Sequence, residues 1–277
     1  FAFVVCIAGN GSFLYVVARV PAMRTTVNLY LGILAACDLI FVVYPTITYE
    51  WQYVASPIRR NLPFTRSIGC VMIYSVPTNM YFFSIILITM LSIDRYYAIC
   101  HPLKHLAMVS KGRTRKILCC AYLLSVLLRT QATLAFAKMV GYCVTWPESD
   151  DFQHFPSTIH VCSPVDPWSS LISEFCFTVT FIIAMFANGF AYVKILKSLK
   201  DRNVSDEFNL ETNNNNDRIR NQVCRMLILN GAIFFLFQFP YRLGFADTIF
   251  IGLFGQGLFS KKQSAILFFV GRCFLLL

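Results

Sequence analysis

Long apolar stretches separated by short polar connectors run the length of the chain. A helix that crosses a bilayer needs about 20 predominantly apolar residues, and stretches of this kind recur throughout. We predict seven helices from them, at about residues 1–20, 27–53, 68–100, 113–137, 168–200, 217–250 and 262–277. The pattern therefore predicts an all-α, seven-transmembrane helix bundle that forms one domain over residues 1–277. Because the first and last apolar runs are cut short, we expect a chain truncated at both ends, with an incomplete seventh helix.

Composition and charge support the membrane interpretation. Hydrophobic residues make up 57% of the chain and charged residues only 14%, whereas a soluble domain carries about a quarter charged residues. The net charge of +10 could indicate nucleic acid, but fifteen of the 24 Lys and Arg residues lie in or beside the first, third and fifth connectors. The positive-inside rule makes these connectors cytoplasmic and the N-terminus extracellular. We therefore expect a multi-pass plasma-membrane protein that contacts the lipid bilayer and not nucleic acid.

The polar groups of the chain narrow the classes of function. A carboxylate such as Asp38 costs about 2.5–3.5 kcal/mol near the bilayer centre, so it should face an interior polar or hydrated pocket. The sequence has no His/Cys spacing typical of metal sites, no nucleophile elbow and no phosphate-binding loop, which argues against an enzyme. Transporters show paired repeats with interrupted helices in both halves, and the sequence contains no internal repeat.

Several of the predicted helices carry a short characteristic motif. The third helix ends in Asp94-Arg95-Tyr96, and Cys70 stands 25 residues before Arg95. The other motifs are Gly9-Asn10, Leu34-Ala-Ala-Cys-Asp38, Tyr192 and Pro240. Taken in the order in which they follow along the chain, these motifs resemble those of the rhodopsin-like (class A) G-protein-coupled receptors, and the resemblance covers nearly the whole chain.

The chain also departs from that family's usual pattern. It has Tyr122 in place of a tryptophan, Ala184 in place of a proline, and Phe237-Gln238 where Cys-Trp is common. The Asn-Pro-x-x-Tyr motif of the seventh helix would lie beyond Leu277. These differences indicate a divergent member of the family.

Residues that distinguish receptor subfamilies favour a neuropeptide ligand. Aminergic receptors carry an aspartate where this chain has Pro77, which argues against a small amine. Two segments, Trp51-Gln-Tyr53 and Ala98-Ile-Cys-His-Pro-Leu103, resemble those of neuropeptide receptors of the ghrelin, neuromedin U and thyrotropin-releasing-hormone group. A proline early in the third helix, here Pro77, resembles the pattern of invertebrate FMRFamide-type receptors. The resemblance implies an invertebrate receptor that binds an extracellular neuropeptide and activates an intracellular heterotrimeric G protein. A chemosensory receptor for a small odorant or pheromone is the alternative, and a membrane transporter is a more distant one.

The resemblance places the ligand between the outer halves of the helices. The residues expected to contact it are Glu50, Trp51, Thr78, Tyr81, Gln238, Tyr241, Arg242, Phe245 and Arg272. Arg242 and Arg272 are expected to pair with an acidic group of the ligand, and Glu50 with an arginine of a peptide. Two alternatives stay open: the aromatic residues serve plain helix packing, or Arg242 forms an internal salt bridge with Asp247 or Glu174.

The same resemblance implies an outer disulfide and an inner coupling site. The disulfide is expected between Cys70 and Cys162, with Cys143 as the alternative partner, because spacing alone does not fix connectivity. In the resting state Arg95 is expected to pair with Asp94. The residues assigned to G-protein coupling and switching are Asp94, Arg95, Tyr96, Tyr192 and Pro240.

A sodium site is also implied by the family resemblance. Asp38 and Ser84, together with Asn10, resemble the family's allosteric sodium site, and carboxylate and hydroxyl oxygens suit a hard cation. The alternative is a hydrated carboxylate in a polar interior network. No other cofactor is expected.

Overall fold

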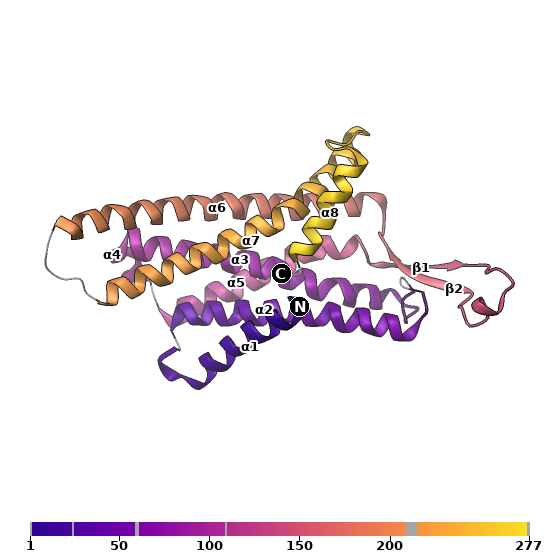
Figure 1. The fold of residues 1–277 in the computed structure, drawn as a ribbon, viewed down its shortest axis with the longest axis horizontal. Helices are drawn as coiled ribbons and strands as arrows, with labels where there is room; N and C mark the ends of the chain where they lie inside the picture. The colour runs from indigo at the N-terminus through magenta and orange to yellow at the C-terminus, as the bar shows by residue number, and fades with distance from the viewer. Residues whose placement is uncertain (1, 24, 59–60, 109, 209–214, 276–277) are drawn as a thin grey trace.

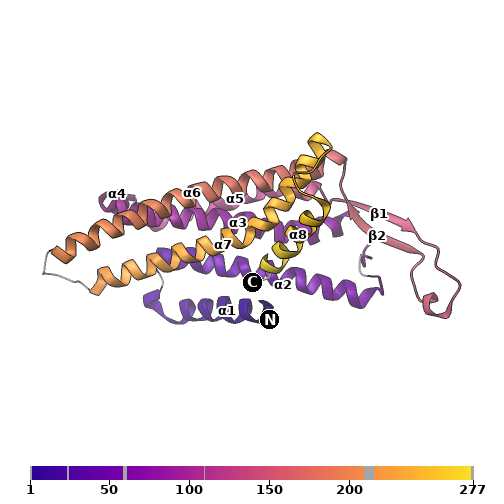
Figure 2. The ribbon, with the colours of Figure 1, turned by 45° about the horizontal axis from the view of Figure 1, so that its top comes forward.

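The structure, a computed structural model, describes residues 2–23, 25–58, 61–108, 110–208 and 215–275. Within these residues, seven long helices form an elongated bundle, and a two-stranded hairpin projects from one end (Figure 1, Figure 2). The elements in chain order are α1 (Ala2–Arg19), η1 (Pro21–Met23), α2 (Thr26–Ala55), α3 (Ser67–Cys100), α4 (Pro102–Met108), α5 (Lys111–Leu134), β1 (Lys138–Cys143), η2 (Asp150–Phe152), β2 (Thr158–Ser163), α6 (Pro167–Phe208), α7 (Asn215–Phe254) and α8 (Lys261–Leu275). The predicted helical bundle is confirmed. The hairpin and the short helix α4 were not predicted by the apolar pattern.

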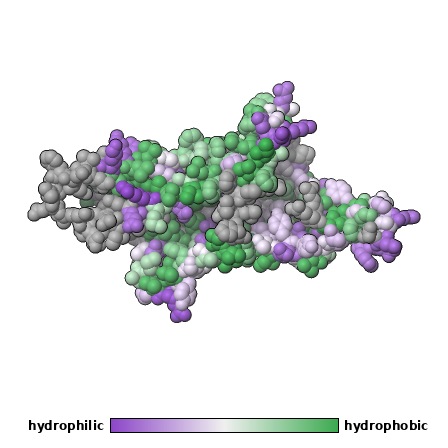
Figure 3. All heavy atoms as spheres, in the orientation of Figure 1, coloured by the Kyte–Doolittle hydropathy of each residue, from purple (hydrophilic) through white to green (hydrophobic). Residues whose placement is uncertain are grey.

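The helices have the length and surface expected in a membrane. Among the described residues, α2, α3, α5, α6 and α7 are long and apolar enough to cross a bilayer, and α1 contributes a shorter apolar helix, Phe3–Arg19. Large apolar side chains point outward, such as Phe186 and Ile183 on α6, which are 69% and 64% exposed. Figure 3 shows hydrophobic atoms over much of the bundle and hydrophilic atoms at the projecting loops. An apolar surface of this extent suits lipid rather than water.

Helix α3 is the centre of the bundle. It packs against α2, α5, α6 and α7, and its side chains Phe82, Ile85 and Leu87 are at most 1% exposed. Phe82 and Ile85 belong to a core cluster with Phe181 of α6 and Phe235 of α7. The middle of α3 is buried on nearly every face, and such a segment needs apolar residues all round. Because it is enclosed in this way, α3 carries residues to both ends of the bundle on one rigid element.

The outer end of the fourth predicted helix differs from the sequence prediction, and the inner end of the third is followed by a short helix that was not predicted. The sequence predicts that the fourth helix reaches residue 137, but α5 ends at Leu134. The apolar run continues there, yet Phe136 leaves the helix and stacks on Tyr74 of α3, with ring centroids 4.4 Å apart. At the inner end, α3 stops and Pro102 begins α4, since proline is favoured at the first position of a helix.

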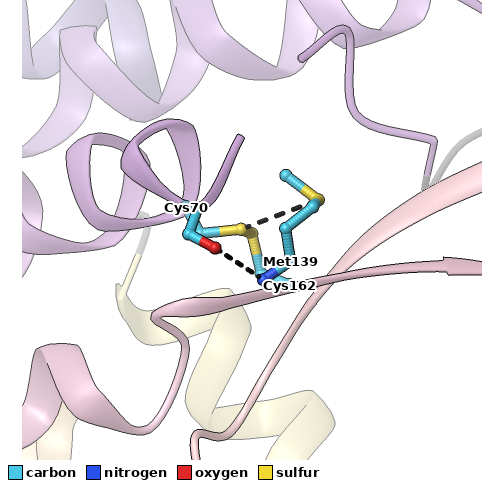
Figure 4. The surroundings of a disulfide bond; sticks show 4 residues. Cys70, Met139 and Cys162 are labelled. Atoms are coloured by element: carbon cyan, nitrogen blue, oxygen red, sulfur yellow. Dashed lines mark hydrogen bonds between the residues drawn. A yellow bond between two sulfur atoms is a disulfide. The ribbon is translucent and has the colours of Figure 1, made fainter. Parts of the chain in front are cut away.

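The outer hairpin is joined to α3 by a disulfide. Strands β1 and β2 pair antiparallel, with Met139 opposite Cys162. Cys162 is bonded to Cys70, near the start of α3 (Figure 4). Cys143, the alternative partner, is an exposed free cysteine that faces Thr158 in the strand register. The Cys70–Cys162 prediction is therefore confirmed.

Hydrogen bonds add to the attachment of the hairpin. The Asn61 side chain accepts a bond from the His160 backbone N–H at 2.9 Å, and the Leu62 N–H donates to the His160 carbonyl at 3.0 Å. The Met139 N–H donates to the Ser67 hydroxyl at 3.3 Å. Both strands are thereby tied to the α2–α3 loop and to the first turn of α3.

Candidate ligand-binding and coupling sites

A buried arginine lies in the outer half of the bundle, where α3, α6 and α7 meet. Arg242, on α7, is only 7% exposed. Its guanidinium carbon lies 4.6 Å from the ring centroid of Tyr81 on α3, 5.0 Å from that of Phe177 on α6 and 5.6 Å from that of Tyr241. Cation–π contacts of this kind stabilise a desolvated charge. The structure therefore brings three predicted contact residues together and adds Phe177 to them.

Neither of the two expected carboxylates forms a salt bridge with Arg242. In the described part of the chain, no carboxylate oxygen lies within 4.0 Å of its nitrogen atoms. The Asp247 carboxylate binds other groups. It accepts hydrogen bonds of 2.6 and 3.1 Å from two backbone N–H groups of the α7–α8 loop and a third from the Ser264 hydroxyl. Glu174, on α6, interacts electrostatically with Arg242 but forms no ion pair with it. The internal salt-bridge alternative is therefore absent from this structure.

Other polar atoms near Arg242 also lack partners. Within the described residues, the Arg242 Nε and the Gln238 Oε1 are buried without a hydrogen bond, whereas the Tyr81 hydroxyl lies close enough to interact with Arg242. Leaving a buried polar group unsatisfied costs about 1–3 kcal/mol, and such groups are few in native proteins. A carboxylate would accept two parallel bonds from a guanidinium. The arginine site is therefore chemically suited to a planar anion.

One further predicted contact residue, Phe245, lies beside the aromatic rings of the arginine site. Phe245 lies one turn beyond Tyr241 on α7, with ring centroids 4.7 Å apart, and its ring is 5.2 Å from that of Phe268 on α8. Thr78 lies on α3 and is half-buried. Arg272 belongs to α8, but its side chain lies outside the described residues. The rings of Phe245 on α7 and Phe268 on α8 thus extend the aromatic surroundings of the site.

Two predicted contact residues lie elsewhere. Glu50 and Trp51, in the outer part of α2, are both exposed. Trp51 packs with Phe64 at a centroid distance of 5.9 Å and lines a groove of about 420 Å³ between α2 and α3. No residue of the arginine site lines that groove. The structure therefore separates this pair from Arg242.

Three residues at or near the arginine site, Phe177, Glu174 and Phe268, were not among the predicted contacts. Phe177 and Phe268 are two of 27 phenylalanines, and spacing does not separate an aromatic at a site from one that only packs. Glu174 carried a signal, since an acidic residue within an apolar segment is a candidate for function.

A cavity of about 380 Å³ lies deeper in the bundle. It extends from Asp38 and Asn10 at one side to Arg95 and Tyr192 at the other. The Ser84 hydroxyl interacts with the Asp38 carboxylate. Oxygen donors of these types fit a hard monovalent cation such as sodium. Within the described residues, no group of three His, Cys, Asp or Glu side chains is placed to hold a metal ion.

The inner end of α3 carries a shared carboxylate. Asp94 forms an ion pair with Arg95 and also lies 3.1 Å from the His105 Nε2 atom. The Tyr96 hydroxyl is 3.1 Å from the His101 Nε2 atom. His105 belongs to no sequence motif and sits in a predicted connector, but in the structure it lies on α4, which returns beside Asp94. Asp94 therefore links α3 to α4 at the cytoplasmic end.

The remaining switch residues lie on α6 and α7. The Tyr192 hydroxyl accepts a hydrogen bond from Ser92 of α3 at 3.0 Å and donates to the Asn188 Oδ1 atom at 3.2 Å. Pro240 lies within α7, between Gln238 and Arg242, and the helix continues through it. The outer site and the inner cavity are therefore connected along one helix.

Comparison with known proteins identifies the family. The sequence profile described as 7 transmembrane receptor (rhodopsin family) matches residues 9–276. This chain belongs to the rhodopsin family of seven-transmembrane receptors. The family consists of signalling receptors, so the chain is a multi-pass receptor of the plasma membrane and not an enzyme, as predicted. The transporter alternative is wrong.

The receptor is similar over part of its length to growth hormone secretagogue receptors. It is 38% identical to growth hormone secretagogue receptor type 1 of Sus scrofa and to that of Homo sapiens, in each case over 118 residues. Identity to the protein of Rattus norvegicus is 37% over the same length. The matched segment covers 42% of this chain and 30% of each relative.

Proposed function

We propose that this receptor binds an extracellular peptide through an acidic group and activates a heterotrimeric G protein inside the cell. The observation that carries the proposal is the state of Arg242. This cation is only 7% exposed and has no anionic partner within 4.0 Å among the described residues. Removing a charge from water costs several kcal/mol unless a counter-charge is supplied. A carboxylate of the ligand would supply that counter-charge. The relatives, named as receptors for growth hormone secretagogues, support an extracellular signal.

The outer end of the receptor offers further contacts for a peptide. Glu50 is exposed on α2, where it would take an arginine side chain of the ligand. Tyr81, Tyr241 and Phe245 provide apolar walls around the arginine site. A small volatile odorant needs a drier and less charged pocket. The charged groups therefore favour a peptide.

Signal transmission would follow from a shift between two conformations. An agonist that binds the active form more tightly raises its population by that difference in affinity. Gln238 and Arg242 are on α7, the same helix whose inner half lines the cavity with Arg95. Arg95, paired with Asp94 at the cytoplasmic end, is the residue that would contact the G protein. Movement of α7 would thus couple the two sites.

A peptide-library screen on the full-length receptor tests this function. Cells expressing the receptor are read out for calcium and cAMP, and an Arg95→Ala variant with matched surface expression serves as the coupling-deficient control. We expect at least one peptide to give a saturable response that the variant loses. Responses to small volatiles with silence to every peptide would reverse the proposal in favour of a chemosensory receptor.

We also propose that Asp38 holds a sodium ion with Ser84 and Asn10. Sodium chloride should raise the thermal stability of the purified receptor relative to choline chloride at equal ionic strength, because an ion that binds only the folded state stabilises it. In the Asp38→Asn variant this difference should disappear, since the amide removes the negative charge. An equal response of both proteins to sodium would favour a polar network without a bound ion.

A further inference from the structure

A buried glycine in the middle of α7 has a specific contact with another helix. Glycine within a helix costs about 1 kcal/mol relative to alanine, so its presence in a long helix calls for a packing reason. Gly231 is buried, and a Cβ atom built at this position would overlap the Tyr192 hydroxyl and lie 2.9 Å from the Tyr192 Cζ atom. The end of the phenol ring therefore rests directly on the backbone of α7.

Hydrogen bonds hold the phenol in that place. Ser92 of α3 donates to the Tyr192 hydroxyl, which in turn donates to the Asn188 side chain. The Asn188 amide nitrogen donates to the Thr89 hydroxyl of α3 at 2.8 Å. Asn188 is only 1% exposed, so the chain of bonds between α3 and α6 is shielded from water. The ring is rigid, and its hydroxyl has little freedom to move away from a new methyl group.

The position of the phenol matters because of what lies beside it. Tyr192, Gly231, Ser92 and Arg95 line the same cavity of about 380 Å³. Ser92 precedes Arg95 by three residues, which is about one helical turn. The described hydrogen bonds of Tyr192 go to Ser92 and Asn188 and not to Arg95. The cavity provides space for the ring to leave its present place.

We propose that Gly231 is a positioning residue. Because it has no side chain, the Tyr192 phenol can lie against the α7 backbone, hydrogen-bonded to α3 and away from Arg95; we call this contact the Gly231–Tyr192 seat. The seat holds α7 in its resting position. The expected effect on signalling rests on the proposed G-protein coupling. The contact between Gly231 and Tyr192, and its expected effect on stability, do not depend on that proposal. A side chain at position 231 would push the phenol into the cavity or move α7 outward. Either change weakens the three-helix contact of α3, α6 and α7.

The test is Gly231→Ala in the full-length receptor. Adding a methylene-sized group to a filled contact strains it, so ligand-independent signalling should rise by at least about threefold at matched surface expression, as expected for a population shift. The melting temperature of the purified receptor should fall by roughly 3–8 °C. The matched control is Gly189→Ala on α6, where a Cβ atom would meet nothing within 4 Å. This control should leave basal signalling unchanged and should not lower the melting temperature.

Second variants separate the seat from the proposed function. Adding Tyr192→Phe to Gly231→Ala removes the hydroxyl that overlaps the new methyl group. The double variant should therefore recover at least half of the decrease in melting temperature seen in Gly231→Ala. If Gly231→Ala does not reach the surface, Ser92→Ala should raise basal signalling in the same direction by removing the α3 partner. The receptor could show the expected melting temperatures in these variants and yet activate no G protein. That result would support the Gly231–Tyr192 seat and refute the proposed G-protein coupling. Unchanged stability in Gly231→Ala, or no recovery in the double variant, would overturn the seat.

Discussion

Replacing Arg242 by glutamine is expected to abolish the agonist response, or to raise the agonist concentration needed for half-maximal response by about 100-fold or more. Glutamine keeps a polar side chain but removes the charge and the pair of parallel donors that a carboxylate would accept. Breaking a buried charge pair costs about 3–5 kcal/mol, and about 1.4 kcal/mol corresponds to a tenfold change in affinity. The measurement is a dose–response curve with the most potent peptide of the screen.

Two controls distinguish ligand binding at Arg242 from a role in packing. Because the charge has no anionic partner among the described residues, its removal should leave the melting temperature of the ligand-free receptor unchanged or higher. A peptide whose acidic group is converted to an amide should lose affinity for the wild type and much less for Arg242→Gln, which is the coupling expected for two groups in contact. An unchanged dose–response curve in Arg242→Gln would remove this residue from the ligand site.

Loss of the Cys70–Cys162 bond is expected to have the second largest effect. The bond joins residues 92 positions apart, and removal of a native disulfide typically costs about 2–5 kcal/mol. Without it, strand β2 is held by its pairing with β1 and by its hydrogen bonds to the α2–α3 loop, and loses its covalent link to α3. Cys162→Ser should therefore reduce surface expression severely and lower peptide affinity more than about tenfold, as measured by flow cytometry and radioligand binding.

The hairpin contains its own control for that experiment. Cys143 is an exposed free cysteine on β1, so Cys143→Ser should match the wild type in expression and affinity. The double variant Cys70→Ser/Cys162→Ser should be no worse than either single variant, because both break the same bond. A strong defect in Cys143→Ser, or additive losses in the double variant, would contradict the assignment.

The bundle was predictable because a lipid-crossing helix is a local property. Each apolar run satisfies its own backbone hydrogen bonds, so length and hydropathy identify it without knowledge of its neighbours. The outer hairpin was missed for the opposite reason. Lys138–Cys143 and Thr158–Ser163 are short strands whose pairing, disulfide and contacts with the α2–α3 loop involve distant residues. The early end of α5 is similar, since Phe136, just beyond it, stacks on Tyr74 of α3, a residue far away in the sequence.

Within the candidate sites, the sequence determined which residues need explanation and the tertiary structure determined how they are used. A charge in an apolar segment must find a partner or a ligand, and this singled out Asp38 and Arg242. Only the folded chain shows that Asp247 is occupied by the α7–α8 loop, so that Arg242 is left among aromatic rings. Likewise, Gly231 is one glycine among 13 in the sequence, and its contact with Tyr192 exists only because α6 and α7 are packed together. The physical reason is that hydrophobicity and charge are carried by single residues, whereas pairing and steric fit depend on which distant side chains meet.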